Sequence, residues 1–113
     1  MQTVHSALQP VIQGPWTDGN LRSYSSEVAA LIAEDCNDAV HLFYPEKLRS
    51  AAAQFNEGFE GKTVYAVKAN PSEAFLLEAW RSGVRAFDVA SLREVETLHR
   101  LLPEADLFFM HPI

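Results

Sequence analysis

The chain has 113 residues, 48% of them hydrophobic, so it is long enough for one small folded domain and is neither disordered nor fibrous. Its net charge of −6 is spread along the sequence, which argues against a nucleic-acid-binding surface, and its single cysteine, Cys36, excludes an internal disulfide and a cysteine-rich zinc site. No apolar run approaches the roughly 20 residues that span a bilayer and the N-terminus lacks a signal-peptide pattern, so we expect a cytoplasmic protein without a membrane or nucleic-acid partner.

Residues 1–37 predict an irregular arm followed by a short helix. Residues 1–19 carry only isolated apolar side chains between breakers, which are Pro10, Gly14-Pro15 and Asp18-Gly19. After Ser25 and Ser26 the apolar side chains recur at helical spacing, so we expect a serine-capped helix that ends near Cys36.

Residues 38–113 alternate between two kinds of element and form the second predicted segment. Short apolar runs predict strands at 39–44, 63–69, 84–90 and 106–113, and amphipathic stretches predict helices from Pro45 to Gly58 or Gly61, from Asn70-Pro71 to Gly83, and from Ser91 to Pro103. The expected inward-facing helix residues are Leu48, Ala51, Ala52, Phe55, Phe59, Phe75, Leu76, Ala79, Trp80, Leu92, Val95, Leu98 and Leu102. Strands that alternate with helices predict an α/β protein with a parallel sheet.

The ends of these predicted strands carry the polar residues. Lys68, Asp88 and His111 each fall at the C-terminal end of a strand, where (β/α)₈ barrels and doubly wound sheets place their functional groups. A complete barrel needs about 250 residues, so the chain is either a small open sheet or part of something larger. Because no helix follows the last apolar strand, we expect the chain to be a fragment of a larger domain.

Lys68 is the unusual residue of the strand at 63–69. If this strand continues to Lys68, the alternation of side chains puts the lysine in one row with Val64 and Ala66. An ammonium group in an interior row must be paired, deprotonated or used covalently, because an unpaired buried charge is costly. Alternatively, the side chain extends from the strand end into water.

Two motifs follow one another at a spacing of one βα unit. The first is Tyr-Ala-Val-Lys-Ala-Asn-Pro at 65–71, and the second is Phe-Asp-Val-Ala-Ser at 87–91 followed by Glu94. Together they resemble the N-terminal pyridoxal-phosphate barrel of the fold type III amino-acid decarboxylases, an alanine-racemase-like barrel family that includes ornithine, lysine, arginine and diaminopimelate decarboxylases. The resemblance covers about 40–113, roughly the first three of eight βα units, and leaves 1–37 unmatched.

The resemblance implies roles for individual residues. Lys68 matches the lysine that forms a Schiff base with pyridoxal 5'-phosphate, and Asp88 matches a carboxylate of the cofactor pocket, although a strand-end aspartate can also bind backbone N–H groups. Ala66 is small and leaves room for the cofactor. Glu94 matches a pocket position, but Ser91 and Glu94 also form a capping box that needs no chemistry. His111 stands where related sequences tend to have asparagine, and a structural role is as good an interpretation.

The same resemblance implies decarboxylation of a basic amino acid, ornithine or else lysine or arginine, in polyamine biosynthesis. Family members act as homodimers, and most of the site would lie beyond Ile113, so we expect the 113-residue chain alone to be inactive. The Leu92-Arg93 pair stands where diaminopimelate decarboxylases usually carry two glycines, and Pro71-Ser72 disfavours a racemase. Three alternatives stay open: diaminopimelate decarboxylase, a non-enzymatic pyridoxal-phosphate-binding or regulatory protein, and a small βαβ binding module.

Overall fold

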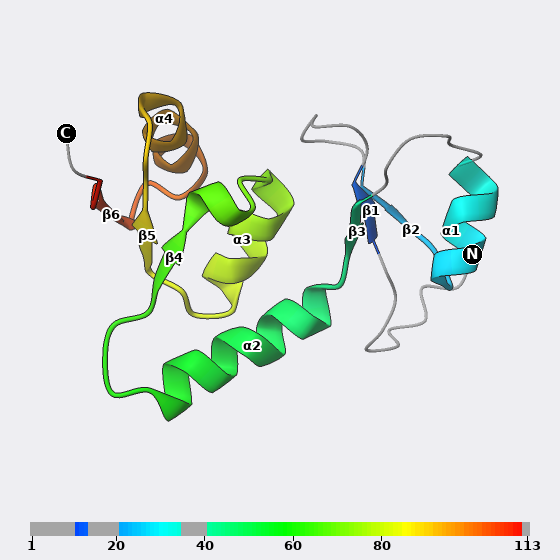
Figure 1. Ribbon diagram of the computed structural model, residues 1–113, viewed down its shortest axis with the longest axis horizontal. Coiled ribbons are helices and arrows are strands. Elements are labelled where there is room, and N and C mark those ends of the chain that lie inside the picture. The colour runs from blue at the N-terminus through cyan, green and yellow to red at the C-terminus, as the bar shows by residue number, and fades with distance from the viewer. Residues whose placement is uncertain (1–10, 14–20, 35–40, 112–113) are drawn as a thin grey trace. The chain divides into compact units, whose positions relative to one another are not determined.

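The computed structural model describes residues 11–13, 21–34 and 41–111. Within these ranges strands and helices alternate, and the chain divides into two compact units, residues 1–47 and 48–113, each of which is described by itself (Figure 1). The sequence-based expectations for 1–10, 14–20, 35–40 and 112–113, including the helix end at Cys36, lie outside the described residues.

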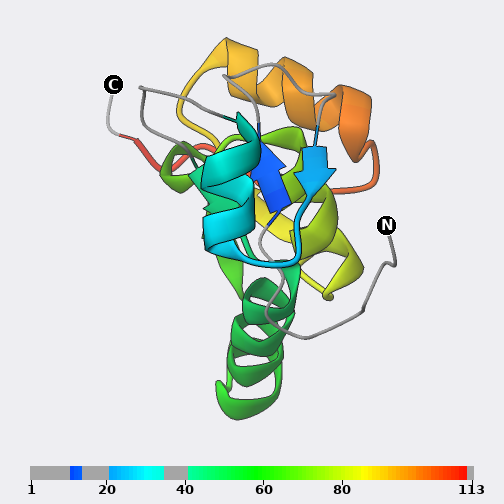
Figure 2. The same cartoon turned by 90° about the vertical axis from the view of Figure 1, so that its right-hand side faces the viewer.

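The first unit contains a three-stranded antiparallel sheet in the order β2-β1-β3, formed by β1 (Val11–Gln13), β2 (Leu21–Ser23) and β3 (His41–Phe43). The strands β1 and β2 run in opposite directions (Figure 2). Ile12 lies opposite Leu42 in the β1–β3 register. Helix α1 (Glu27–Glu34) begins where Ser26 Oγ accepts a hydrogen bond from the Ala29 N–H at 3.1 Å, which confirms the predicted serine cap.

Two expectations for this part of the chain were wrong. Val11–Gln13 is a strand and not part of an irregular arm, because pairing with two neighbours supplies the hydrogen bonds that its three residues cannot supply locally. The strand expected at 39–44 pairs antiparallel with β1 instead of joining the parallel sheet. Among the described residues, the parallel sheet therefore has three strands and not four.

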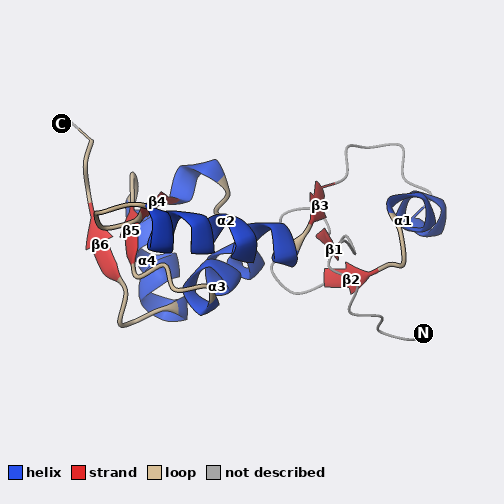
Figure 3. Ribbon diagram, turned by 90° about the horizontal axis from the view of Figure 1, so that it is seen from below, coloured by secondary structure: helices blue, strands red, loops and turns tan. Residues whose placement is uncertain are grey.

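The second unit holds that parallel sheet, in the order β4-β5-β6, made of β4 (Val64–Ala66), β5 (Ala86–Asp88) and β6 (Asp106–Phe108). Helix α3 (Glu73–Arg81) connects β4 to β5, and α4 (Leu92–Leu101) connects β5 to β6. Helix α2 (Pro45–Gly58) precedes β4. The three helices lie together on one side of the sheet (Figure 3), as right-handed βαβ crossovers require for α3 and α4. The described part of the chain therefore has an α/β fold, and its parallel sheet does not close into a barrel.

The core of the second unit lies between the sheet and these helices. Tyr65, Phe87 and Leu107 stand opposite one another in the strand register and all point into it. Phe87 is fully buried, and its ring meets that of Tyr65 edge to face at a centroid distance of 6.2 Å. The helices contribute the buried side chains Ala52, Leu76, Ala79 and Leu98. This alternation leaves Val64, Ala66, Ala86, Asp88, Asp106 and Phe108 on the opposite face.

One long side chain spans that opposite face. Lys62 precedes β4, yet its ammonium lies 2.5 Å from Asp106 of β6 and 5.2 Å from the centroid of the Phe108 ring. Because Ala86 of the middle strand has a small side chain, which is fully buried, the lysine can reach from the first strand to the third. No pattern in the residues predicted this contact.

Local signals set most of the helix boundaries. Helix α2 begins at Pro45 as predicted, and Gly83 after α3 has a φ of +98°, the left-handed conformation expected of a glycine that ends a helix. Helix α3 begins later than expected, because Ser72 and not Asn70 caps it through Oγ, which accepts from the Phe75 N–H at 3.4 Å.

Some side chains that were expected to face inward lie in solvent. Phe55 of α2 is 61% exposed, Phe59 just after this helix is 60% exposed, Leu92 of α4 is 72% exposed, and Ala51 is exposed as well. Helical periodicity predicted Leu76, Ala79, Leu98 and Leu102 correctly as buried, but for α2 only Ala52 of the expected stripe is buried.

Candidate functional site

The polar candidates from the sequence lie where the three parallel strands end. We call this region the carboxyl edge. Each of its three segments begins with the last residue of a strand: residues 66–70 from β4, 88–91 from β5 and 108–111 from β6, together with Glu94 of α4. Ala66, Asp88 and Phe108 form its first layer, since each is paired in register with the next. The structure thus places Lys68, Asp88 and His111 at one edge of one sheet, as the parallel topology predicts.

Lys68 is not part of the strand. Strand β4 ends at Ala66, and Val67–Ala69 form a short 3₁₀ turn in which Val67 is buried and Lys68 is exposed. The expected row of Val64, Ala66 and Lys68 side chains is therefore broken after its second member. Among the described residues, no hydrogen bond or ion pair involves the Lys68 amine, so this amine is accessible at the carboxyl edge.

Asp88 and Ala66 stand side by side at the end of their strands. Ala66 is half-buried, and Asp88 is its register partner. Oδ1 of Asp88 accepts a hydrogen bond from the Met110 backbone N–H at 3.3 Å, which ties the segment after β6 to the end of β5. This is the backbone-binding role that a strand-end aspartate can have, and it uses only one of the two carboxylate oxygens.

Ser91 and Glu94 form the start of α4. Ser91 Oγ accepts from the Glu94 N–H at 3.2 Å, so Ser91 is the N-cap. The Glu94 carboxylate reaches back and accepts through Oε2 from the Ala90 N–H at 2.5 Å, one residue before the position that a standard capping box uses. Glu94 therefore fixes the backbone that directly follows Asp88 and Val89.

Tyr65 and Asn70 hold the turn that carries Lys68. The Tyr65 hydroxyl donates to the backbone carbonyl of Asn70 at 3.3 Å, and Asn70 Oδ1 accepts from the Ser72 N–H at 3.1 Å. The Tyr65 ring packs against Phe75 with the centroids 5.2 Å apart. Neither hydrogen bond was predicted from the sequence. The motif nevertheless contains the signal for them, because Tyr65 precedes Asn70 by five residues and a helix begins soon after Asn70.

Burial raises the pKa of Tyr65 from the ordinary 10.0 to about 12. Because the folded pKa exceeds the unfolded one, this residue's contribution to stability is fully present below about pH 10 and is lost as the pH rises to about 12. We expect the denaturation midpoint of the protein to fall across this interval. Tyr65→Phe should flatten the fall, and an equal pH profile in this variant would contradict the assignment.

His111 lies at the far end of the carboxyl edge. Its ring meets that of Phe109 edge to face at 5.9 Å, and its Nε2 is shielded from solvent and has no hydrogen-bond partner among the described residues. A nitrogen without solvent access is poorly placed to meet an incoming ligand. The geometry therefore gives His111 no chemical role.

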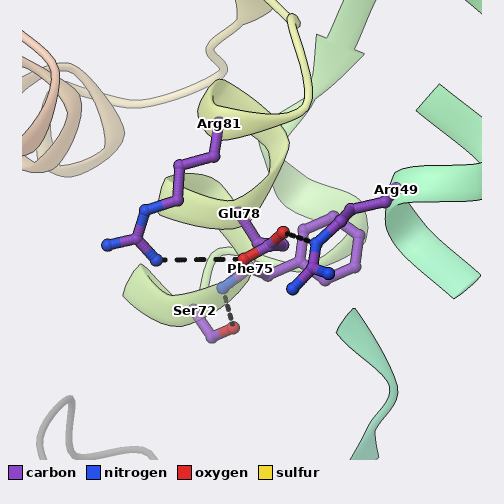
Figure 4. Close-up of polar contacts among 5 residues, drawn as sticks. All are labelled: Arg49, Ser72, Phe75, Glu78 and Arg81. Carbon is purple, nitrogen blue, oxygen red and sulfur yellow. Dashed lines mark hydrogen bonds and ion pairs between the residues drawn. The ribbon is translucent and has the colours of Figure 1, made fainter. Parts of the chain in front are cut away.

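A second polar cluster lies away from this edge, between α2 and α3. Glu78 is nearly buried, and its carboxylate meets Arg49 Nε of α2 at 2.5 Å and Arg81 Nη1 at 3.8 Å (Figure 4). Each carboxylate oxygen therefore has one guanidinium partner, Oε1 with Arg49 and Oε2 with Arg81. We assign this cluster a structural role, the joining of two helices.

Two searches of the described residues were negative. They contain no group of three or more histidine, cysteine, aspartate or glutamate side chains placed to hold a metal ion. No helix in the same part of the chain has the length and apolar character needed to cross a bilayer.

Comparison with known proteins identifies no relative. No protein-family model matches the chain, no curated protein matches its sequence, and no solved structure matches its fold. The function of the protein is therefore inferred from the residues of the carboxyl edge and their geometry.

Proposed function

We propose that this chain supplies the lysine-bearing strands of a pyridoxal-phosphate-dependent decarboxylase that acts on a basic amino acid, ornithine or alternatively lysine or arginine. The observation that carries the proposal is the position of Lys68. Its amine is exposed, has no partner among the described residues, and lies two residues after a parallel strand whose last residue, Ala66, is paired with Asp88.

The residues present fit such a cofactor in three respects. A primary amine is required to hold an aldehyde covalently, and the Lys68 amine is accessible. Ala66 has a small side chain and is the register partner of Asp88, and Asp88 keeps one carboxylate oxygen that the hydrogen bond to Met110 does not use. Phosphate-binding groups are not among the described residues of this edge.

Each residue then has a defined task. Lys68 would anchor the cofactor, and Asp88 would carry a negative charge beside it while it holds the segment after β6 in place. Glu94 would shape the same pocket by fixing the Ala90 backbone. When bound, pyridoxal phosphate supplies an electron sink for the charge that loss of carbon dioxide leaves on an amino acid.

The sheet order supports a barrel as the complete architecture in this proposal. Strands β4, β5 and β6 are neighbours in the order in which they occur, and their connecting helices lie on one side. An arc of a (β/α)₈ barrel has this arrangement, with the helix-free face turned inward. In the homodimer that we propose for the full enzyme, a second subunit would complete the site.

The proposal is tested by covalent trapping on the 113-residue chain. Incubation with pyridoxal 5'-phosphate joins an amine nitrogen to the aldehyde carbon with loss of water, and borohydride then fixes the product for peptide mass spectrometry. The three lysines compete within one molecule, since Lys47 lies over the Tyr44 ring and Lys62 is paired with Asp106. We expect a preference for Lys68 of about fivefold, because a cation–π contact or ion pair contributes about 1 kcal/mol.

Equal labelling of the three lysines, or labelling mainly at Lys62, would contradict the proposal. The matched control is Lys68→Arg, which keeps the positive charge and should remove only the dominant adduct. No carbon dioxide release is expected from this chain alone, because the described residues provide an anchor and no substrate-binding groups.

A further inference from the structure

The turn after β4 departs from the extended path that its sequence favours. Thr63 to Ala69 is rich in residues of high strand propensity, yet the strand ends at Ala66 and the backbone bends at Val67–Ala69. No proline, glycine or left-handed residue lies inside this bend. Side-chain contacts can therefore add to the backbone hydrogen bonds of this 3₁₀ turn.

Two such contacts enclose the bend. The Tyr65 hydroxyl, in the strand before it, donates to the carbonyl of Asn70, in the segment after it, at 3.3 Å. The Asn70 side chain in turn accepts from the Ser72 N–H at 3.1 Å, which joins the bend to the N-cap of α3. We call this pair of contacts the clasp.

The clasp is anchored in the core. Tyr65 is half-buried, and its ring packs against Phe75 and Phe87, with ring centroids 5.2 Å and 6.2 Å away, so the ring that carries the hydroxyl is part of the core. Since Tyr65 stays protonated far above neutral pH, its hydroxyl remains a hydrogen-bond donor under ordinary conditions.

We propose that Tyr65 and Asn70 are positioning residues for Lys68: their clasp holds the 3₁₀ turn that presents the amine at the carboxyl edge. This inference rests on the proposed function, because it gives the turn its purpose. Without the clasp, the segment is free to continue as a strand, which would turn the Lys68 side chain to the position that the alternation predicts. The proposal assigns neither residue a contact with the cofactor.

Two variants test the clasp. Tyr65→Phe removes the hydroxyl and keeps the packed ring, and Asn70→Ala removes the tie to Ser72 at a half-buried surface position where folding should be tolerant. Each is treated with pyridoxal 5'-phosphate and borohydride, and the adduct at Lys68 is expressed relative to those at Lys47 and Lys62. At 3.3 Å the hydroxyl contact is long, so we expect each variant to lower this ratio by about twofold to fivefold.

The absolute adduct levels separate positioning from stability: a general loss of structure would release Lys47 and Lys62 from their contacts and raise the labelling of both, whereas loss of the clasp alone lowers labelling at Lys68 and leaves the other two lysines unchanged. Tyr44→Phe is the control for the loss of a tyrosine hydroxyl remote in sequence from the turn, and it should leave the Lys68 to Lys62 ratio unchanged. If the wild type prefers Lys68 and both variants keep that preference, the clasp is overturned while the proposed function stands. If the wild type shows no preference, the proposed function fails and this inference falls with it. Should Tyr65→Phe fail to fold, Asn70→Ala decides.

Discussion

Phe87→Ala is expected to destabilise the second unit by about 3–5 kcal/mol, the range measured when a large buried aromatic side chain is removed from a core. The Phe87 side chain has no exposure to solvent. It belongs to the middle strand of the sheet, its ring meets that of Tyr65 edge to face, and it lies in the core beneath the helices. A unit of this size has little stability to spare, so the variant should be largely unfolded at 25 °C. Urea denaturation followed by circular dichroism measures the loss.

Phe55→Ala is the matched control, because the same side chain is removed from a site that is 61% exposed. Surface substitutions of this kind usually change stability by no more than about 0.5 kcal/mol. Equal midpoints for the two variants would mean that the core is not centred on Phe87.

Arg49→Ala is expected to cost about 1–3 kcal/mol, because it leaves the nearly buried Glu78 carboxylate without its closest cation. Arg81→Ala should cost less than about 1 kcal/mol, since this guanidinium is 3.8 Å from the carboxylate and its side chain is 70% exposed. Thermal denaturation of both variants tests the order of the two effects.

A double-mutant cycle isolates the Arg49–Glu78 contact from the other contacts of Arg49. Replacement of both residues, as Arg49→Met with Glu78→Leu, should recover most of the stability that Arg49→Ala loses, because no charge is then left buried. A double variant as unstable as the single one would show that packing, and not charge pairing, dominates this site.

Local sequence signals account for what could be predicted of the fold. Pro45, Gly83 and Ser91 mark helix boundaries through contacts within a few residues, so the pattern alone was sufficient. The antiparallel pairing of β1 with β3 depends on residues about 30 apart, and a three-residue strand carries no periodicity that would reveal it. The exposure of Phe55 and Leu92 depends on how wide a surface the sheet offers, which no helix pattern contains.

The candidate site was likewise predictable only in part. A parallel sheet places the strand ends together, so the positions of Lys68 and Asp88 at one edge followed from the topology. The end of β4 at Ala66 did not, because the residues from Thr63 to Ala69 favour an extended strand while the structure has a 3₁₀ turn at Val67–Ala69. For Glu94, the capping interpretation and the pocket interpretation involve the same carboxylate, and the structure shows its contact with the Ala90 N–H, which belongs to the capping interpretation.

The reach of Lys62 across the helix-free face bears on the order in which the second unit folds. Neighbouring strands of this sheet are separated in the sequence by a single helical connection. Lys62 and Asp106, in contrast, are 44 positions apart and can meet only when β5 already lies between their strands. Contacts that close so long a loop form late, after the costly loss of chain entropy. The Lys62–Asp106 contact should therefore stabilise the folded sheet and not the folding transition state. Removal of the lysine side chain should speed unfolding and leave the folding rate almost unchanged.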